Sequence, residues 1–285
     1  MLLYWMIILI EMSFRYLIIV LFAGQLFAQK ISGRILTDKE GPVSDVRIGV
    51  ENENVGDITD KTGSYTLDIT DVAKSKVVKV EISGYEPFRM NLSDFLVLSD
   101  HTILLKNKSI EIPNIEVISK KYVTKNFGTK NSKRAYGGYN SDKPERLFRE
   151  YAIKVKNNKR IKIKNINISL AYFSFEQPAA IIFDVQDSIN DLPGESQVNE
   201  TLKLTFTKDD IKNNTLSLDV SDKNIWIDQD FFVSFRVSED FKGELYFGGN
   251  IFAFSKNTYY RTYFGEWQKY SSGEPSINVD VLMEK

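Results

Sequence analysis

Apolar and polar residues alternate along most of this chain, and this pattern constrains the fold more than any other feature of the sequence. In residues 46–50, for example, Val46, Ile48 and Val50 would share one side of an extended segment. A period of two residues is typical of a β-strand with one buried face. Turn residues such as Asp60-Lys61-Thr62-Gly63 separate the alternating runs. The sequence therefore predicts an all-β protein.

Residues 30–85 also carry spaced features in a distinctive order. The run GRILTDKEGPVSDVRI is followed by VGDITDKTGSYTL, and Ser83-Gly84-Tyr85 follows the next predicted strand. In these features residues 29–119 resemble the carboxypeptidase-regulatory-like domain. The matching residues are Gly33, Gly41, Pro42, Val46, Val50, Gly56, Thr59, Asp60, Gly63, Tyr65 and Leu67. The resemblance implies a seven-stranded, prealbumin-type, Ig-like β-sandwich that acts as a scaffold, in an exported protein of Bacteroidota-like bacteria.

A second region of alternation covers residues 146–285, with runs at 166–172, 202–206, 216–220 and 231–237. Eight or nine short strands without a long helical period predict a second antiparallel sandwich, of jelly-roll type. Residues 120–145 lack a clear period and are rich in Lys, Gly and Asn. We expect these residues to form a basic linker between the two sandwiches.

The formal net charge of −1 hides a separation of charge along the chain. Residues 120–164 contain fifteen Lys or Arg and three Asp or Glu, whereas residues 165–285 contain ten and nineteen. The basic segment is either an anion-binding patch for an acidic polysaccharide or a solvated linker followed by strands with Lys-rich outer faces. We favour the second interpretation. Nucleic acid is not expected as a partner because the chain carries an export signal.

Residues 1–28 are hydrophobic, with Glu11 and Arg15 as their charges. We interpret them as a signal peptide that begins at Met12, has Arg15 as its positive residue and is cleaved after Ala28. The alternative is a membrane anchor, since the whole apolar stretch is close to spanning length. The mature protein is therefore expected in the periplasm, on the outer-membrane surface or outside the cell, and would contact a membrane only through an uncleaved signal segment.

The residues needed for several kinds of chemistry are absent from the sequence. Without cysteine there can be no disulfide, thiolate metal site or lipidated N-terminal cysteine. His101 is the one histidine and is expected to be structural. Acidic pairs at 209–210, 219/222 and 228/230 suit turns better than a calcium site. No phosphate-binding loop, nucleophile elbow or zincin motif occurs. We therefore predict no catalytic residue, no metal and no cofactor.

Aromatic residues are densest between Gly243 and Tyr270. If they are exposed, their flat faces could stack on sugar rings; otherwise they fill the core and its edges. The candidates for a glycan-binding platform are Tyr259, Tyr263, Trp267 and Tyr270. Tyr259 and Tyr260 are neighbours in one predicted strand, so they should point to opposite faces.

These features together predict a non-enzymatic, exported two-module protein that acts as a binding or scaffold component of the cell envelope, with a glycan or an envelope protein as partner. One alternative is a carboxylate-based glycan hydrolase in residues 146–285, with Glu244 or Glu266 as possible acids. Another is a structural partner of an outer-membrane receptor complex that docks through a strand edge. The sequence leaves the oligomeric state open.

Overall fold

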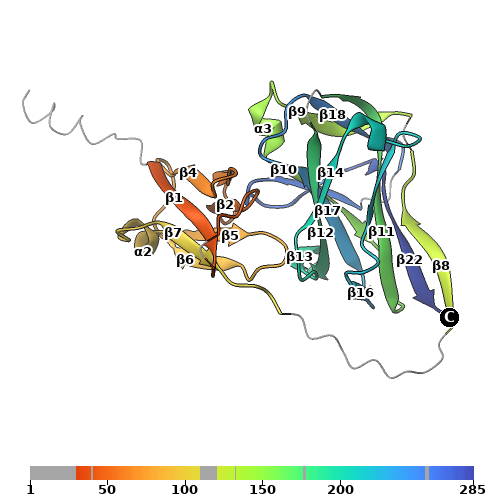
Figure 1. The fold of residues 1–285 in the computed structure, drawn as a ribbon, viewed down its shortest axis with the longest axis horizontal. Helices are drawn as coiled ribbons and strands as arrows, with labels where there is room; N and C mark the ends of the chain where they lie inside the picture. Colours follow the sequence, from red (N-terminus) through yellow and green to blue (C-terminus); the bar gives the residue numbers. More distant parts are fainter. Residues whose placement is uncertain (1–29, 40, 110–120, 132, 176–177, 254–256) are drawn as a thin grey trace, which may run out of the picture.

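The computed structural model describes residues 30–39, 41–109, 121–131, 133–175, 178–253 and 257–285. Nearly all of its regular structure is β, arranged as two sandwiches that lie side by side (Figure 1). This confirms the predicted all-β sandwich fold. The predicted signal peptide, residues 1–28, lies outside the described residues. In the described part of the chain, no helix is both long enough and apolar enough to cross a membrane.

The first sandwich contains seven strands within residues 30–105. They are β1 (Lys30–Thr37), β2 (Arg47–Val50), β3 (Gly56–Ile58), β4 (Ser64–Asp68), β5 (Val77–Glu81), β6 (Phe88–Asn91) and β7 (Thr102–Leu105), with α2 (Leu92–Leu96) before the last strand. One sheet has the order β4-β1-β7 and the other β3-β2-β5-β6. β1 and β7 are parallel, so the first and last strands are neighbours.

The predicted alternation accounts for the core of the first sandwich. Val46, Ile48 and Val50 are fully buried, with none of their surface exposed. They pack with apolar residues from the facing sheet, among them Ile35 and Leu67. The inward position of β1 nearest to Tyr65 is Gly33, where a Cβ would lie 2.2 Å from the carbonyl oxygen of His101. A side chain at Gly33 would therefore separate β1 from the residues packed against it.

The second sandwich is larger and contains both long and very short strands. Its strands are β8 (Tyr122–Gly128), β9 (Ala135–Asn140), β10 (Arg149–Val155), β11 (Ile161–Ser174), β12 (Ala179–Ile189), β13 (Leu192–Ser196), β14 (Leu202–Phe206), β15 (Thr215–Asp219), β16 (Trp226–Ile227), β17 (Phe231–Val237), β18 (Glu244–Asn250), β19 (Thr258–Thr262), β20 (Gln268–Lys269), β21 (Glu274–Pro275) and β22 (Ile277–Glu284). The short helices are α3 (Pro144–Leu147) and the 3₁₀ turn η1 (Lys208–Asp210).

These strands form two sheets around one apolar core. The first sheet has the order β13-β12-β17-β10-β19-β20, with β14 also paired to β12. The second has the order β21-β18-β11-β22-β8, with β15 and β16 paired to β11 and β9 paired to β18. Inward-facing residues such as Phe183, Phe235 and Phe247 fill the space between the sheets.

The predicted linker at 120–145 is wrong for its described residues. β8 pairs with β22 along seven registered residues, from Tyr122 to Gly128. β9 pairs with β18, and Tyr139 of β9 is completely buried in the core of the second sandwich. The glycines of β9 concealed the strand, because they are required for packing. A Cβ on Gly137 would lie 2.6 Å from the Phe247 ring, and a Cβ on Gly138 would lie 2.4 Å from the Leu245 carbonyl oxygen.

The two sandwiches contact each other through the polar faces of two sheets. Outward-facing residues of β2 and β5, such as Arg47 and Glu81, meet those of β10 and β19, such as Glu150 and Arg261. All four of these side chains are buried. Alternation places some residues on the solvent face of one sandwich. In the whole protein the other sandwich can bury these residues.

Candidate functional site

A cluster of buried charges joins the two sandwiches. We call it the interdomain ion cluster, and it consists of Arg47, Glu81, Glu150 and Arg261. The guanidinium of Arg47 donates to a carboxylate oxygen of Glu150, and Nε of Arg261 donates to the same oxygen at 2.7 Å. Ser234 donates to the other Glu150 oxygen at 2.8 Å. Glu150 thus binds an arginine from each sandwich, Arg47 from the first and Arg261 from the second, and these two positive charges compensate its negative charge.

The charges of this cluster set its protonation state. Burial alone would raise the pKa of Glu150, but Arg261 and Arg47 outweigh burial and hold the pKa at about 2. The pKa of Glu81 is also lowered to about 2 because Lys79, Arg47 and Arg261 outweigh its burial. Both carboxylates are therefore ionised at neutral pH, and their role is to bind arginines.

Phe264 packs against the cations of the interdomain ion cluster. Its ring is almost fully buried, and three cations lie over it: Arg47 at 5.0 Å, Lys79 at 5.3 Å and Arg261 at 5.5 Å from the ring centroid. Trp267 lies against the same Arg261, with the guanidinium 4.4 Å from its ring centroid. Cation–π contacts of this kind strengthen when water is excluded.

Near the cluster, the described residues include an acid, Asp184, whose pKa moves toward neutrality. It is buried on the outer face of β12, and burial, together with the charges of Glu81 and Glu150, raises its pKa to about 7, although the Ser196 hydroxyl and Arg47 act in the opposite direction. The void beside it has a volume of about 20 Å³. That volume holds one water molecule and excludes a sugar ring.

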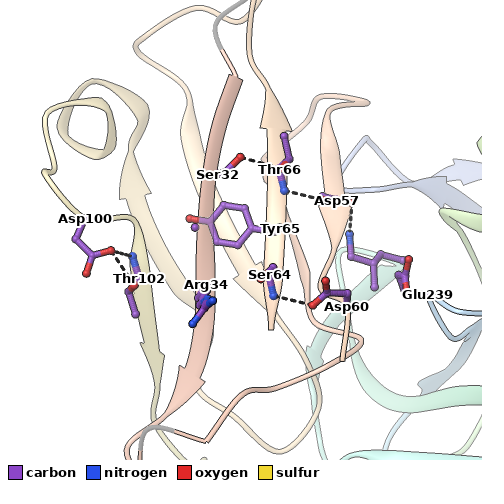
Figure 2. A pocket seen from close by; sticks show the side chains of 12 residues that line it. Ser32, Arg34, Asp57, Asp60, Ser64, Tyr65, Thr66, Asp100, Thr102 and Glu239 are labelled. Carbon is purple, nitrogen blue, oxygen red and sulfur yellow. Dashed lines mark hydrogen bonds between the residues drawn. The ribbon is translucent and has the colours of Figure 1, made fainter. Parts of the chain in front are cut away.

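A larger hollow, of about 700 Å³, lies over the outer face of β1 and β4 in the first sandwich. We call it the polar hollow. Figure 2 shows Ser32 and Arg34 on β1 and Ser64 and Thr66 on β4, with Glu239 of the second sandwich at the opposite side from Asp100. The polar hollow therefore has walls from both sandwiches.

Hydrogen bonds fix the polar groups of this hollow in place. The hydroxyl groups of Ser32 and Thr66 are 2.9 Å apart, and Asp57 accepts from the Thr66 backbone N–H at 2.7 Å. Asp60 accepts from the backbone N–H of Ser64 at 3.0 Å (Figure 2). Burial raises the pKa of Asp57, whereas hydrogen bonds from Thr62 and Ser64 lower that of Asp60. These groups are arranged to accept and donate hydrogen bonds.

The charge of the hollow restricts what it can bind. It is lined by four acids, Asp57, Asp60, Asp100 and Glu239, and by one cation, Arg34. This balance disfavours phosphate and other anions and favours neutral hydroxyl groups or cations. Where the structure describes the chain, no group of three or more His, Asp or Glu side chains is placed to hold a metal ion.

The structure does not bring the four predicted platform residues together. Tyr259 is buried on the outer face of β19, where it forms a small cluster with Phe232, Ala152 and Trp267. Tyr263 stacks on Phe148 with ring centroids 4.4 Å apart. Tyr270 packs against the main core beside Tyr260, with centroids 4.6 Å apart. Each ring thus has a packing partner within the protein, and the four share no single face.

The remaining predicted residues lie in structural positions. The ring of His101 bonds to the Phe95 carbonyl oxygen at 3.1 Å. Asp210 caps η1 by accepting from the backbone N–H of Thr207 at 2.7 Å, and Asp219 accepts from the Ser221 N–H at 2.8 Å. Glu244 accepts from the Asn140 side chain at 2.7 Å, and Glu266 is exposed at the edge of a separate hollow. Glu244 is thus a hydrogen-bond acceptor between β9 and β18, and Glu266 lies at that separate hollow.

Sequence reasoning missed the residues that hold the two sandwiches together. By alternation with Val46, Ile48 and Val50, Arg47 faces away from the core of its own sandwich, and no sequence pattern indicated a role for Glu150. A signal that could have indicated Arg47 is a charged residue close to a buried glycine, as in Arg47-Ile48-Gly49. A Cβ on Gly49 would lie 2.9 Å from the Phe264 ring, so this face of β2 must remain flat where the second sandwich contacts it.

Comparisons with known proteins give no family for this chain. No protein-family model and no curated protein matches its sequence. Among solved structures, a variant of BcpA, the major pilin subunit of Bacillus cereus, aligns with 87% of this chain and 68% of its own at 8% identity and a TM-score of 0.20. The VP2 subviral particle of infectious bursal disease virus aligns with 85% of this chain and 60% of its own at 8% identity and a TM-score of 0.26.

Proposed function

We propose that this protein is an exported, non-enzymatic binding component of the cell envelope and that its polar hollow binds a glycan. The observation that carries the proposal is the hollow itself. The first sandwich supplies its hydroxyl groups and three carboxylates, the second supplies the carboxylate of Glu239, and hydrogen bonds fix Ser32, Thr66 and Asp57. Directed donors and acceptors in a concave site suit a neutral, hydroxyl-rich ligand. The interdomain ion cluster supports this role because it holds the two walls together.

The resemblance of residues 29–119 to the carboxypeptidase-regulatory-like domain fits this proposal. The first and last strands of the first sandwich are paired, and its two sheets have three and four strands. We infer that this sandwich is a scaffold domain of that type, in a protein of a Bacteroidota-like bacterium. In this arrangement the first sandwich supplies most of the hollow and the second supplies Glu239.

The experiment is a screen of neutral oligosaccharides with the full chain, followed by titration of each ligand that is retained. Ser32→Trp places a large side chain on the exposed floor of the hollow and should reduce affinity at least tenfold. Ser75→Trp, at an exposed turn of the same sandwich, should bind like the wild type. Retention of no neutral glycan by the wild type, or equal binding by the two variants, would overturn the proposal.

One observation favours the hydrolase as a second candidate. A buried acid with a pKa of about 7, such as Asp184, could serve as a general acid. Its small void argues against this role because a sugar has no space beside the carboxyl group. Assays of glycan hydrolysis by the wild type and Asp184→Asn decide between these views. If the wild type hydrolyses a glycan and Asp184→Asn does not, the protein is a glycan hydrolase that uses Asp184.

A further inference from the structure

The outer face of the second sheet of the second sandwich carries a group of residues separate from the polar hollow. We call this group the Trp226 face, and it consists of Tyr122, Arg160, Lys162 and Trp226. Lys162 of β11 is registered with Trp226 of β16, and Tyr122 of β8 is registered with Glu284 of β22. In Figure 1, β8 and β22 lie on the side of the molecule away from the first sandwich.

The two rings of this face are not needed by the core. Tyr122 is 41% exposed, and Trp226 is partly exposed. Among the described residues, neither ring belongs to the apolar core cluster or to the side chains packed against it. Their centroids are 6.2 Å apart at an interplanar angle of 56°. A tyrosine and a tryptophan on a polar sheet face provide an apolar surface that a ligand can cover.

Two cations lie beside these rings. The guanidinium of Arg160 is 5.0 Å from the Trp226 ring centroid, and the ammonium of Lys162 is 5.8 Å from it. Lys162 also donates to the side-chain oxygen of Asn224 at 2.7 Å. Both cations therefore lie beside the Trp226 ring, where a ligand anion that approaches the ring would meet them.

A row of amide and carboxylate groups continues along the same sheet face from β8 across β22 to β11. We call it the amide ladder, and it consists of Asn126, Asn167, Asn278 and Asp280. The side-chain N–H groups of Asn126 donate to Asn278 and Asp280, both at 2.7 Å, and those of Asn167 donate to the same two residues at 3.0 Å. These bonds use the side-chain N–H groups of Asn126 and Asn167, so a ligand hydroxyl group would donate to the oxygen atoms of the exposed Asn126 and the partly exposed Asp280.

Burial alone would raise the pKa of Asp280, but the amides of Asn167 and Asn126 and the charge of Lys130 lower it. Asp280 therefore remains ionised and accepts hydrogen bonds. Of the ladder residues, Asn126 is exposed and Asp280 is partly exposed, whereas Asn167 and Asn278 are buried.

We propose that the Trp226 face and the amide ladder together bind an acidic polysaccharide. Sugar rings stack on the exposed aromatic surface, uronate carboxylates pair with the two cations, and sugar hydroxyl groups donate to Asn126 and Asp280, the accessible members of the ladder. This site goes beyond the proposed function because it lies on a different surface from the polar hollow and binds an anionic polysaccharide, whereas the hollow is proposed to bind a neutral glycan.

The experiment measures binding of alginate oligosaccharides, which are uronate polymers, to the full chain by calorimetry. Trp226→Ala should weaken binding at least tenfold, and the double variant Arg160→Gln, Lys162→Gln should weaken it similarly and reduce its dependence on salt. Carboxyl-reduced alginate should bind at least tenfold more weakly than alginate to the wild type. Circular dichroism and Tm confirm that each variant is folded.

Phe252 and Arg134 provide a matched control. Phe252 is 66% exposed, and the Arg134 guanidinium lies 5.2 Å from its ring centroid, so this is another exposed cation–π pair. Phe252→Ala should bind alginate as the wild type does. The inference is overturned if the wild type does not bind alginate, or if Phe252→Ala and Trp226→Ala weaken binding equally. Loss of alginate binding in Ser32→Trp alone would instead place the anionic ligand in the polar hollow.

Discussion

Arg47 of the first sandwich donates a hydrogen bond to Glu150 of the second, and both side chains are buried. This pair lies between two sheets that would each be exposed in an isolated sandwich. Removing one partner of a buried ion pair costs more than the pair contributes, because it leaves the other charge without compensation. The contact between the sandwiches therefore depends on all members of the cluster being present.

Glu150→Ala should lower the free energy of unfolding by about 3–5 kcal/mol, because Arg47 and Arg261 would remain buried without their carboxylate. Urea denaturation checks this value. Lys61→Ala is the control, since the Lys61–Asp240 pair also joins the two sandwiches but has side chains that are 82% and 49% exposed. The Tm of Lys61→Ala should not differ measurably from that of the wild type. Equal effects of the two substitutions would contradict the importance assigned to the buried cluster.

Asp184 should make stability fall as pH rises. Its pKa is about 7 in the folded protein and near 4 when unfolded, so between these values the folded state binds the extra proton. Stability is then lost from about pH 4 to pH 7. Asp184→Asn should remove this decrease, as measured by urea denaturation across that range. A wild-type profile that stays flat between pH 4 and 7 would contradict the raised pKa.

Glu81 and Glu150 should have the opposite effect at lower pH. Their folded pKa values of about 2 lie below the unfolded value, so the unfolded state binds more protons as pH falls below about 4.5. Stability should therefore decrease from about pH 4.5 toward pH 2, and Asp184→Asn should retain this decrease. Glu150→Gln should reduce the acid-induced loss, and an unchanged slope in that variant would count against the ion cluster as its source.

Tyr139→Ala should destabilise the protein by about 3–5 kcal/mol because it empties a fully buried position between the sheets. The Tyr139 hydroxyl also donates to the Phe235 carbonyl oxygen at 3.1 Å. Thermal unfolding measures the loss. Tyr172→Ala, at a site that is 51% exposed, should have little effect. If both substitutions were equally mild, residues 135–140 would be a linker after all.

Gly84→Ala should loosen the contact between the sandwiches. Gly84 has a φ of +89°, and a Cβ there would lie 2.5 Å from the backbone Cα of Glu200 on the second sandwich. We expect a loss of at least about 1 kcal/mol from the backbone strain alone. Small-angle scattering should show a larger radius of gyration than for Gly41→Ala, where the nearest atom is 3.4 Å away.

Local patterns predicted the strands that pack within one sandwich. Val46, Ile48 and Val50 are buried as their spacing predicts, and Tyr259 and Tyr260 do point to opposite faces of β19. These outcomes depend on a period of two residues, which a single strand contains. The same rule failed in β9, because the sequence Gly137-Gly138 is needed by neighbours about a hundred residues later in the chain.

The contact between the sandwiches could not be predicted in this way. A polar residue on the outer face of a strand is exposed in an isolated sandwich, but it is buried if a second sandwich packs on that face. The sequence around Arg47 would be the same whether or not the second sandwich covered it. The same limitation applies to Tyr263 and Trp267. Their density in the sequence left open whether they form a platform or fill the core and its edges. Phe148, which is distant in sequence, stacks on Tyr263, and Arg261 lies over the ring of Trp267, while both aromatic residues stay partly exposed.

The chain enters the first sandwich through β1 and leaves it after β7, and these strands are parallel, with Arg34 opposite Thr102 and Thr37 opposite Leu105. A pull between Lys30 and Leu105 would therefore slide one strand along the other. The bonds between the strands would share that force and break together, which requires more force than opening them one at a time. The first sandwich is thus suited to resist stretching wherever both of its ends are held.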